Sequence, residues 1–238
     1  MQELPRKILE PVLTGLDQAF GQRYSAVVYG SVPRDEFVEG VSDINLLLIC
    51  DQLASEQLVR LGGILGDLRR QGYPPPLLFE PDEWARAADV FPVEMADMLA
   101  AHLTVRGPDP LSSIRVDPGD LRRVLEQELR GKLLRLRQAC ALQQTEPEVL
   151  QGSVVSSVSS MAALFRALLV LTGSRPASNT PEALRAAGLV LGHDLEPVIQ
   201  LWEKHRRKDA SCPPELLERY LAAISAAIRF VDQFTGGS

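Results

Sequence analysis

The residues of this chain whose types and spacing could do chemistry lie in the stretch VVYGSVPRDEFVEGVSDINLLLIC, residues 27–50. Gly30 and Ser31 follow one apolar run, and Asp43 and Asn45 open the next. Residues two apart on a strand point to the same face, so Asp43 and Asn45 are expected to project side by side. Oxygen donors at this spacing suit Mg²⁺, which binds through one or two protein carboxylates together with substrate phosphates. The stretch therefore predicts a magnesium site at the start of a buried strand.

Gly30 and Ser31 predict a phosphate contact beside this metal. Glycine allows the backbone to approach a phosphate closely, and Pro33 fits the first turn of a short helix whose N–H groups would attract an anion. Arg34 is either a phosphate ligand or a solvated charge. Phosphate and metal would then be held on adjacent strands, which is the arrangement that phosphoryl transfer requires.

The Gly30-Ser31 pair followed by Asp43-Ile44-Asn45 resembles the signature of the polymerase-β-type nucleotidyltransferases, in which Gly-Ser precedes Asp-x-Asp on a strand. That family joins its α/β domain to a C-terminal helical domain, as in the aminoglycoside nucleotidyltransferases and the minimal nucleotidyltransferases. The resemblance implies transfer of a nucleoside monophosphate from a nucleoside triphosphate, expected to be ATP, to a hydroxyl group, with release of pyrophosphate. The acceptor would be a small molecule or a protein, and the helical domain would shape its pocket.

The resemblance also assigns roles to individual residues. Asp43 and Asn45 would hold Mg²⁺ and take part in catalysis, while Gly30, Ser31 and Arg34 would hold the triphosphate. Metal and positioning would do most of the work, because they neutralise charge that develops on the phosphoryl oxygens.

Asn45 departs from the family pattern, which has a second aspartate there. An amide oxygen can ligate a cation but brings no charge, and a two-metal site depends on several carboxylates. A third carboxylate is expected on a following strand as base or metal ligand, and Glu80 is assigned this catalytic role, with Glu94 as second choice. The readings that stay open are a magnesium-dependent nucleotidyltransferase, a degenerate relative that binds a nucleotide or a partner, and an interaction module whose helices form a homodimer.

The composition is that of a soluble globular protein rather than a nucleic-acid or membrane protein. Hydrophobic residues make up 45% and charged residues 24%, and the net charge of −6 gives no general attraction to nucleic acid. The three cysteines lie far apart without a C-x-x-C pair, which argues against a zinc site. The apolar segment 153–173 contains five serines and Arg166, so we expect a buried helix there. The N-terminal residues carry scattered charges and no long apolar core, so we expect no signal peptide and a cytoplasmic protein.

The elements that must position the site fall into two halves. Residues 1–115 alternate between helical and strand patterns, with helices expected over 5–20 and 53–70 and strands over 25–29, 44–50 and 77–80. Residues 116–238 are helical throughout, with helices expected over 121–143, 149–172, from 179, and over 194–207 and 213–234. The basic residues between Arg122 and Arg137 face either a nucleotide or solvent. The predicted fold class is α+β: an N-terminal nucleotidyltransferase-like mixed sheet with helices, followed by an all-α helical bundle.

Overall fold

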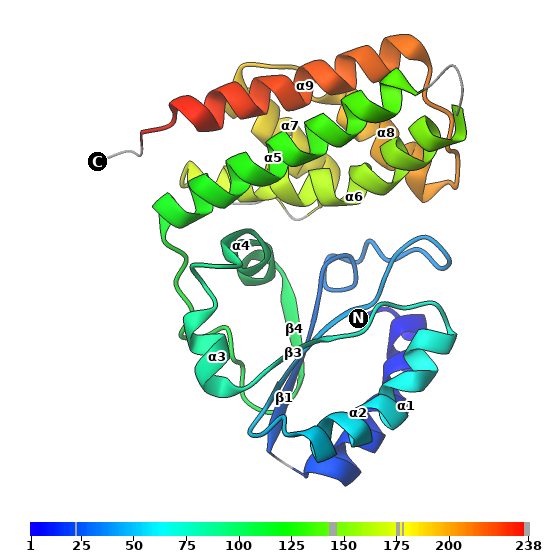
Figure 1. The fold of residues 1–238 in the computed structure, drawn as a ribbon, viewed down its shortest axis with the longest axis vertical. Helices are drawn as coiled ribbons and strands as arrows, with labels where there is room; N and C mark the ends of the chain where they lie inside the picture. The colour runs from blue at the N-terminus through cyan, green and yellow to red at the C-terminus, as the bar shows by residue number, and fades with distance from the viewer. Residues whose placement is uncertain (22, 143–146, 175–176, 178, 236–238) are drawn as a thin grey trace. The chain divides into compact units, whose positions relative to one another are not determined.

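The computed structural model describes residues 1–21, 23–142, 147–174, 177 and 179–235. The chain divides into two compact units, coloured along the sequence in Figure 1. The first, here called the sheet unit, comprises Met1–Ala88 and Met98–Arg115. The second, the helical unit, comprises Asp89–Asp97 and Val116–Ser238. Residues 89–97 thus pack with the helical unit, although a single division at 115 would place them in the N-terminal half.

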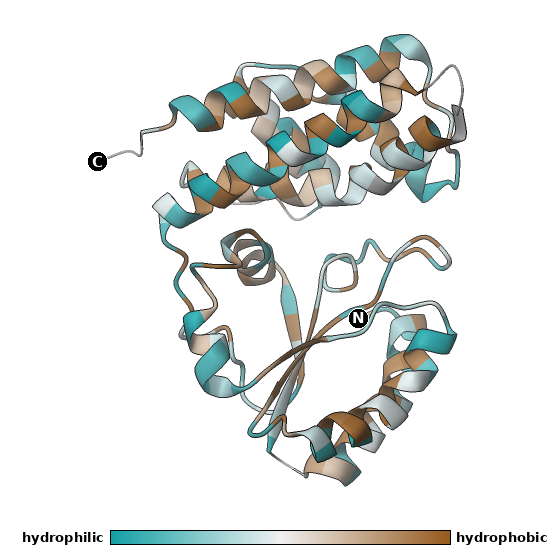
Figure 2. Cartoon of the chain, viewed as in Figure 1, coloured by the Kyte–Doolittle hydropathy of each residue, from teal (hydrophilic) through white to brown (hydrophobic). Residues whose placement is uncertain are grey.

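The sheet unit is built on four strands in the order β3-β2-β1-β4. Their bounds are Tyr24–Tyr29 for β1, Asn45–Cys50 for β2, Leu77–Phe79 for β3 and His102–Arg106 for β4. Strand β1 is antiparallel to both β2 and β4, whereas β2 and β3 are parallel. The two central strands are buried along almost their whole length, except for Tyr29 and Asn45 at one end. Figure 2 shows their hydrophobic character, which is typical of strands covered on both faces.

The sheet unit includes the helices α1 (Glu3–Phe20), α2 (Ser55–Arg70) and α3 (Pro81–Arg86). Helix α4 (Pro92–Ala100) begins in the helical unit and ends in the sheet unit. Helix α1 buries an apolar stripe at the three- and four-residue spacing of an amphipathic helix. In the core this stripe joins one face of the sheet, and the residues concerned are Leu9, Val12, Leu13, Leu16, Ala26, Val28, Leu46 and Leu48. Full burial of each large apolar side chain contributes about 1.5–3 kcal/mol, so this layer holds the strands that carry the candidate site.

The helical unit contains α5 (Pro118–Ala141), α6 (Pro147–Leu171), α7 (Thr180–Leu191), α8 (Glu196–Arg206) and α9 (Pro214–Gln233). Helix α6 contacts α5, α7 and α8 and supplies much of the core. Side chains cap two of the helix starts: Asp117 accepts hydrogen bonds from Gly119 N and Asp120 N, and Asn179 accepts one from Glu182 N. The helix start predicted at Asn179 is therefore confirmed.

One helix in the described part of the chain, Val149–Leu171, is long and apolar enough to cross a membrane by length and composition. Most of it is buried against the other helices of the unit. Its Arg166 forms a buried ion pair with Asp97, with Nε 2.6 Å from Oδ1, and its Nη1 donates to Thr180 Oγ1 at 3.1 Å. These contacts are those of a core helix, in agreement with the buried helix predicted for this segment.

The predicted fold class is confirmed, since a mixed sheet with helices is followed by a set of packed helices. The sequence analysis did not anticipate α3 or β4. Strand β4, with the sequence HLTVR, is only partly buried at every position, so it lacks the apolar run that revealed β1 and β2.

Candidate functional site

The Gly-Ser pair and the Asp-x-Asn motif meet at one end of the sheet. Tyr29, the last residue of β1, is paired with Asn45, the first residue of β2. Gly30 has φ +82°, and a Cβ atom placed there would lie 2.6 Å from Asn45 Nδ2. The predicted adjacency of the two strands is thus present, and the close approach explains why a glycine stands at this position. We refer to Gly30, Ser31, Asp43 and Asn45 as the corner.

The loop after Gly30 is a series of turns rather than the short helix expected at Pro33. Asp35 has φ +58°, in the left-handed region, which is incompatible with continuing a right-handed helix. Glu36 N donates to Ser31 O at 2.9 Å, and Arg34 Nη1 donates to Gly30 O at 2.8 Å. The expectation of a helix N-terminus at this loop is therefore wrong, and Arg34 supports the loop backbone itself.

The two residues of the Asp-x-Asn motif have different environments. Asn45 is half-buried in the strand, whereas Asp43 is exposed and precedes the first strand residue. Strand alternation therefore does not by itself set the direction of the Asp43 side chain. Partial burial and then the carboxylates of Glu39 and Asp43 raise the pKa of Tyr73. The Tyr73 hydroxyl thus lies within the electrostatic influence of Asp43.

Glu80 does not reach the corner. Strands β2 and β3 run parallel, with Leu47 opposite Leu77 and Ile49 opposite Phe79, so Glu80 follows the end of β3 that lies away from Asn45. Five residues of strand correspond to about 16 Å. Glu80 Oε1 instead accepts a hydrogen bond from Leu53 N at 2.8 Å, and the residue caps helix α3. The assignment of Glu80 as the third carboxylate is therefore wrong, because β3 places it at the opposite end of the sheet.

The other candidate positions do not supply a third carboxylate in the sheet unit. Continuing the β2–β3 register back to the level of Asn45 leads to Pro75, which has no donor side chain. Glu94 lies on α4, in the segment that belongs to the helical unit. Among the residues that the structure describes, no group of three or more His, Cys, Asp or Glu side chains could hold a metal.

Asp43 and Asn45 are the metal donors that the corner offers. One carboxylate and one amide oxygen fit a single Mg²⁺ that takes most of its ligands from substrate phosphates and water. They do not fit a pair of metal ions, whose mutual repulsion has to be offset by several carboxylates.

Two of the basic residues of α5, Arg122 and Arg130, are paired within their own unit. Glu126 accepts hydrogen bonds from Arg122 Nη1 at 3.2 Å and from Arg130 Nε at 2.7 Å, and Arg122 also donates to Val231 O. These contacts favour the reading in which the helix is stabilised by ion pairs along its surface.

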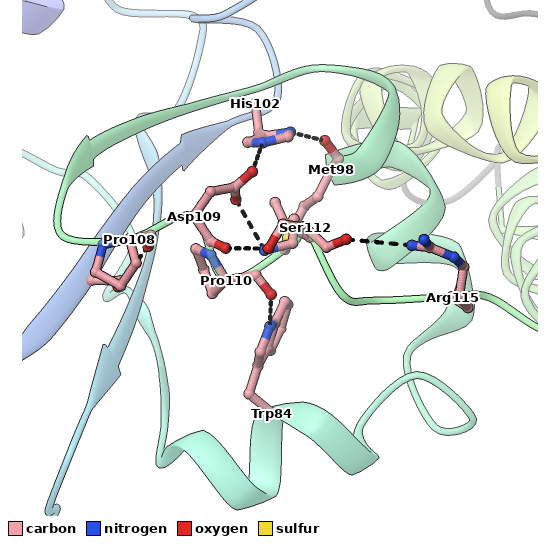
Figure 3. A network of polar contacts seen from close by, with 10 residues as sticks. Trp84, Met98, His102, Pro108, Asp109, Pro110, Ser112 and Arg115 are labelled. Atoms are coloured by element: carbon pink, nitrogen blue, oxygen red, sulfur yellow. Dashed lines mark hydrogen bonds and ion pairs between the residues drawn. The ribbon is translucent and has the colours of Figure 1, made fainter.

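A histidine that the sequence analysis did not single out also lies at the corner end of the sheet. His102 begins β4 and is paired with Tyr29. Its Nδ1 is 2.9 Å from Met98 O and its Nε2 is 3.3 Å from Asp109 Oδ2, as Figure 3 shows. Recognition of β4 was the missing signal, because only the strand pairing brings residue 102 next to residue 29.

Comparison with known proteins supports the fold. Neither a protein-family model nor a curated protein matches the sequence. Among solved structures, this chain is similar to spectinomycin adenyltransferase AAD(9) from Enterococcus faecialis, crystallised with ATP and spectinomycin. The TM-score is 0.55 at 11% sequence identity, over 96% of this chain and 99% of the other. The likeness shows that the chain shares the fold of this adenyltransferase, an α+β part followed by a helical C-terminal part.

Proposed function

We propose that the protein binds a nucleoside triphosphate, with ATP as the first candidate, together with one Mg²⁺ at the corner. Gly30 and Ser31 would contact the triphosphate, and Asp43 and Asn45 would hold the metal. The observation that carries this proposal is the close approach of the Asn45 side chain to Gly30, where an added Cβ would lie 2.6 Å from Asn45 Nδ2, so that the Gly-Ser loop and a metal donor lie side by side. The fold likeness to an adenyltransferase crystallised with ATP and spectinomycin supports a nucleotide and a small-molecule partner.

Nucleotidyl transfer is the reaction that this fold suggests. An acceptor hydroxyl of a small molecule or a protein would attack the α-phosphorus, and pyrophosphate would leave with its charge neutralised by the metal. The sheet unit offers Asn45 in place of a second carboxylate, and Glu80 lies at the far end of the sheet. These two facts favour a protein that binds nucleotide and transfers it slowly, or not at all, over a fast transferase.

The decisive experiment is a calorimetric titration of ATP and GTP into the protein with and without Mg²⁺. We expect Mg²⁺-dependent binding that Asp43→Asn abolishes. Gly30→Ala should also abolish it, because the new methyl group would displace the Asn45 side chain. Gly72→Ala is the matched control, since Gly72 has a similar φ of +86° but no atom within 4 Å of its added Cβ. An absence of binding in every condition would overturn the proposal.

Asn45→Asp tests whether the missing charge limits nucleotide binding and nucleotidyl transfer. If the missing charge limits the site, this substitution should strengthen Mg²⁺-nucleotide binding and raise the rate of pyrophosphate release. If the wild type already binds Mg²⁺-nucleotide as tightly as the variant and releases pyrophosphate as fast, the amide of Asn45 does not limit the site. A cytoplasmic location and a homodimer are further proposals that rest on the sequence alone.

A further inference from the structure

His102 lies at one end of a row of three residues at the corner end of the sheet. Asn45 is paired with Tyr29, and Tyr29 is paired on its other side with His102. Residues directly opposite each other on antiparallel strands carry their side chains on the same face. The three side chains therefore lie in one row across β2, β1 and β4, and Gly30 is the next residue after the middle one.

The imidazole lies between two hydrogen-bond acceptors. Nδ1 lies 2.9 Å from the carbonyl oxygen of Met98, and Nε2 lies 3.3 Å from a carboxylate oxygen of Asp109. Both partners are acceptors, whereas a neutral imidazole has one donor and one acceptor nitrogen. Both contacts are hydrogen bonds only when the ring carries two protons. Met98 lies in the last turn of α4, where the helix dipole also favours a cation.

The carboxylate of Asp109 is itself held in place. Its Oδ1 accepts a hydrogen bond from Leu111 N at 2.9 Å, and its carbonyl oxygen accepts one from Ser112 Oγ at 2.9 Å. The adjacent Pro110 carbonyl accepts the indole N–H of Trp84 at 2.8 Å (Figure 3). Asp109 Oδ2 is therefore presented to His102 by a loop that is anchored at several points.

Two other side chains in this region could affect the histidine. Arg115, the other charged residue labelled in Figure 3, donates to the carbonyl oxygens of Ser112 and Ile114. Tyr29 carries a phenol next to the imidazole in the row across the sheet. Asp109 is thus the ionised group that the described contacts place against the ring.

We propose that His102 is a positioning residue for the nucleotide site, acting through Tyr29 and Gly30 when its ring carries both protons. By joining the end of α4 to the loop at Asp109, it fixes the start of β4 against Tyr29, and so fixes the backbone from which the Gly30 loop departs. When the ring loses a proton, one of its nitrogens presents a lone pair to an acceptor. One of the two hydrogen bonds that join α4 to the Asp109 loop is then lost. The inference rests on the proposed function, because it concerns the same nucleotide site.

The test uses the full chain and two variants, with Mg²⁺-ATP affinity measured by calorimetry at about pH 6 and about pH 8.5, the range over which histidines titrate. From about pH 6 to about pH 8.5, the affinity of the wild type for Mg²⁺-ATP should fall about fivefold more than that of Asp109→Asn. In Asp109→Asn the amide can donate to a neutral Nε2, while its oxygen keeps the bond from Leu111 N. This variant should therefore bind at the higher pH as wild type does at the lower one. Protonation of ATP affects its binding to both proteins equally, so it does not contribute to the difference between wild type and Asp109→Asn.

His102→Gln should bind weakly at both pH values, and thermal unfolding would show whether it is folded. The same pH profile for wild type and Asp109→Asn would overturn the inference alone, leaving the proposed function intact. An absence of binding in every protein would overturn the proposed function and, with it, the link to nucleotide. Nitrogen NMR of the His102 ring gives an independent readout, since a neutral ring at about pH 6 would also contradict the inference.

Discussion

The two ends of the sheet use polar residues in different ways. At the end where β1 begins, Tyr24 donates to Asp17 Oδ1 at 2.6 Å and Arg106 Nε donates to Asp17 Oδ2 at 3.1 Å. Ser25 Oγ there donates to Pro108 O at 2.7 Å. We call this the anchored end. At the corner, by contrast, Asn45 is half-buried beside Gly30 and Asp43 is exposed. The comparison indicates that polar residues secure the fold at one end and stay exposed or half-exposed at the other.

The charges at the anchored end are coupled. The hydrogen bond from Tyr24 and the neighbouring Arg106 lower the pKa of Asp17 against the opposing effect of burial. Burial and the Asp17 carboxylate raise the pKa of Tyr24. The ionised form of Asp17 is therefore the one that the folded protein favours.

The largest effect on stability is expected from Gly107→Ala at the anchored end. Gly107 has φ +69°, and an added Cβ would collide with the Tyr24 carbonyl oxygen and lie 2.8 Å from Ser25 Oγ. We expect a loss of about 3 kcal/mol in the free energy of unfolding, measured by urea denaturation.

Gly72→Ala is the control for this substitution, because Gly72 shares a positive φ without crowding. It should cost about 1 kcal/mol from backbone strain alone. Equal losses in the two variants would show that the packing around Tyr24 contributes nothing beyond that strain.

Tyr24→Phe should have the next largest effect, about 1 kcal/mol at neutral pH, because it removes the hydrogen bond to Asp17. The pKa of Asp17 is lowered in the folded state, so its contribution is present above the usual aspartate range and is lost as the pH falls through the folded value. The difference between wild type and Tyr24→Phe should therefore shrink at about pH 3. A difference in stability that stays constant with pH would show that the contribution of Tyr24 does not depend on the ionised Asp17 carboxylate.

Asn45→Asp should change stability less, by about 0.5 kcal/mol without metal, because Asp43 next to it is exposed. Its effect should appear in the shift of the unfolding midpoint on addition of Mg²⁺, with an increase in metal affinity of about tenfold. Asp43→Asn in the same assay should remove the shift. A large loss of stability in Asn45→Asp would mean that the corner, too, is structural.

The smallest effect is expected from Glu56→Gln on α2. Glu56 and Arg60 form an ion pair at 2.7 Å, but their side chains are 73% and 58% exposed. Pairs of this kind contribute about 0.3–0.5 kcal/mol. The variant therefore shows how little stability changes when an exposed ion pair is lost, for comparison with the substitutions at both ends of the sheet. A larger change in the free energy of unfolding, measured by denaturation, would mean that Glu56 makes a further contact.

The sequence predicted those features that local patterns determine. Strands β1 and β2 are continuous apolar runs, so their positions and the meeting of Gly30 with Asn45 could be anticipated. The cap at Asn179 follows from its position just ahead of Pro181. The direction of β3 could not be predicted, because a three-residue strand carries no signal for parallel or antiparallel pairing. Glu80 was misplaced for this reason.

His102 was overlooked for a different physical reason. Its significance depends on the pairing of β4 with β1, which joins residues 73 positions apart in a half-buried strand without a marked apolar pattern. Its ring contacts then depend on the end of α4 and on the loop at Asp109, neither of which the sequence pattern revealed.

The ion pair between Asp97 and Arg166 has a consequence for the independence of the two units. The helical unit is discontinuous in sequence, because its residues 89–97 are followed by 98–115, which belong to the sheet unit. Asp97 is synthesised 69 residues before Arg166, so the ion pair that buries this arginine cannot form until most of α6 exists. A protein cut at residue 115 would leave Arg166 buried without its carboxylate, at a cost of about 3–5 kcal/mol. The two halves are therefore not interchangeable modules, and recombination between relatives would have to carry residues 89–97 along with the helices.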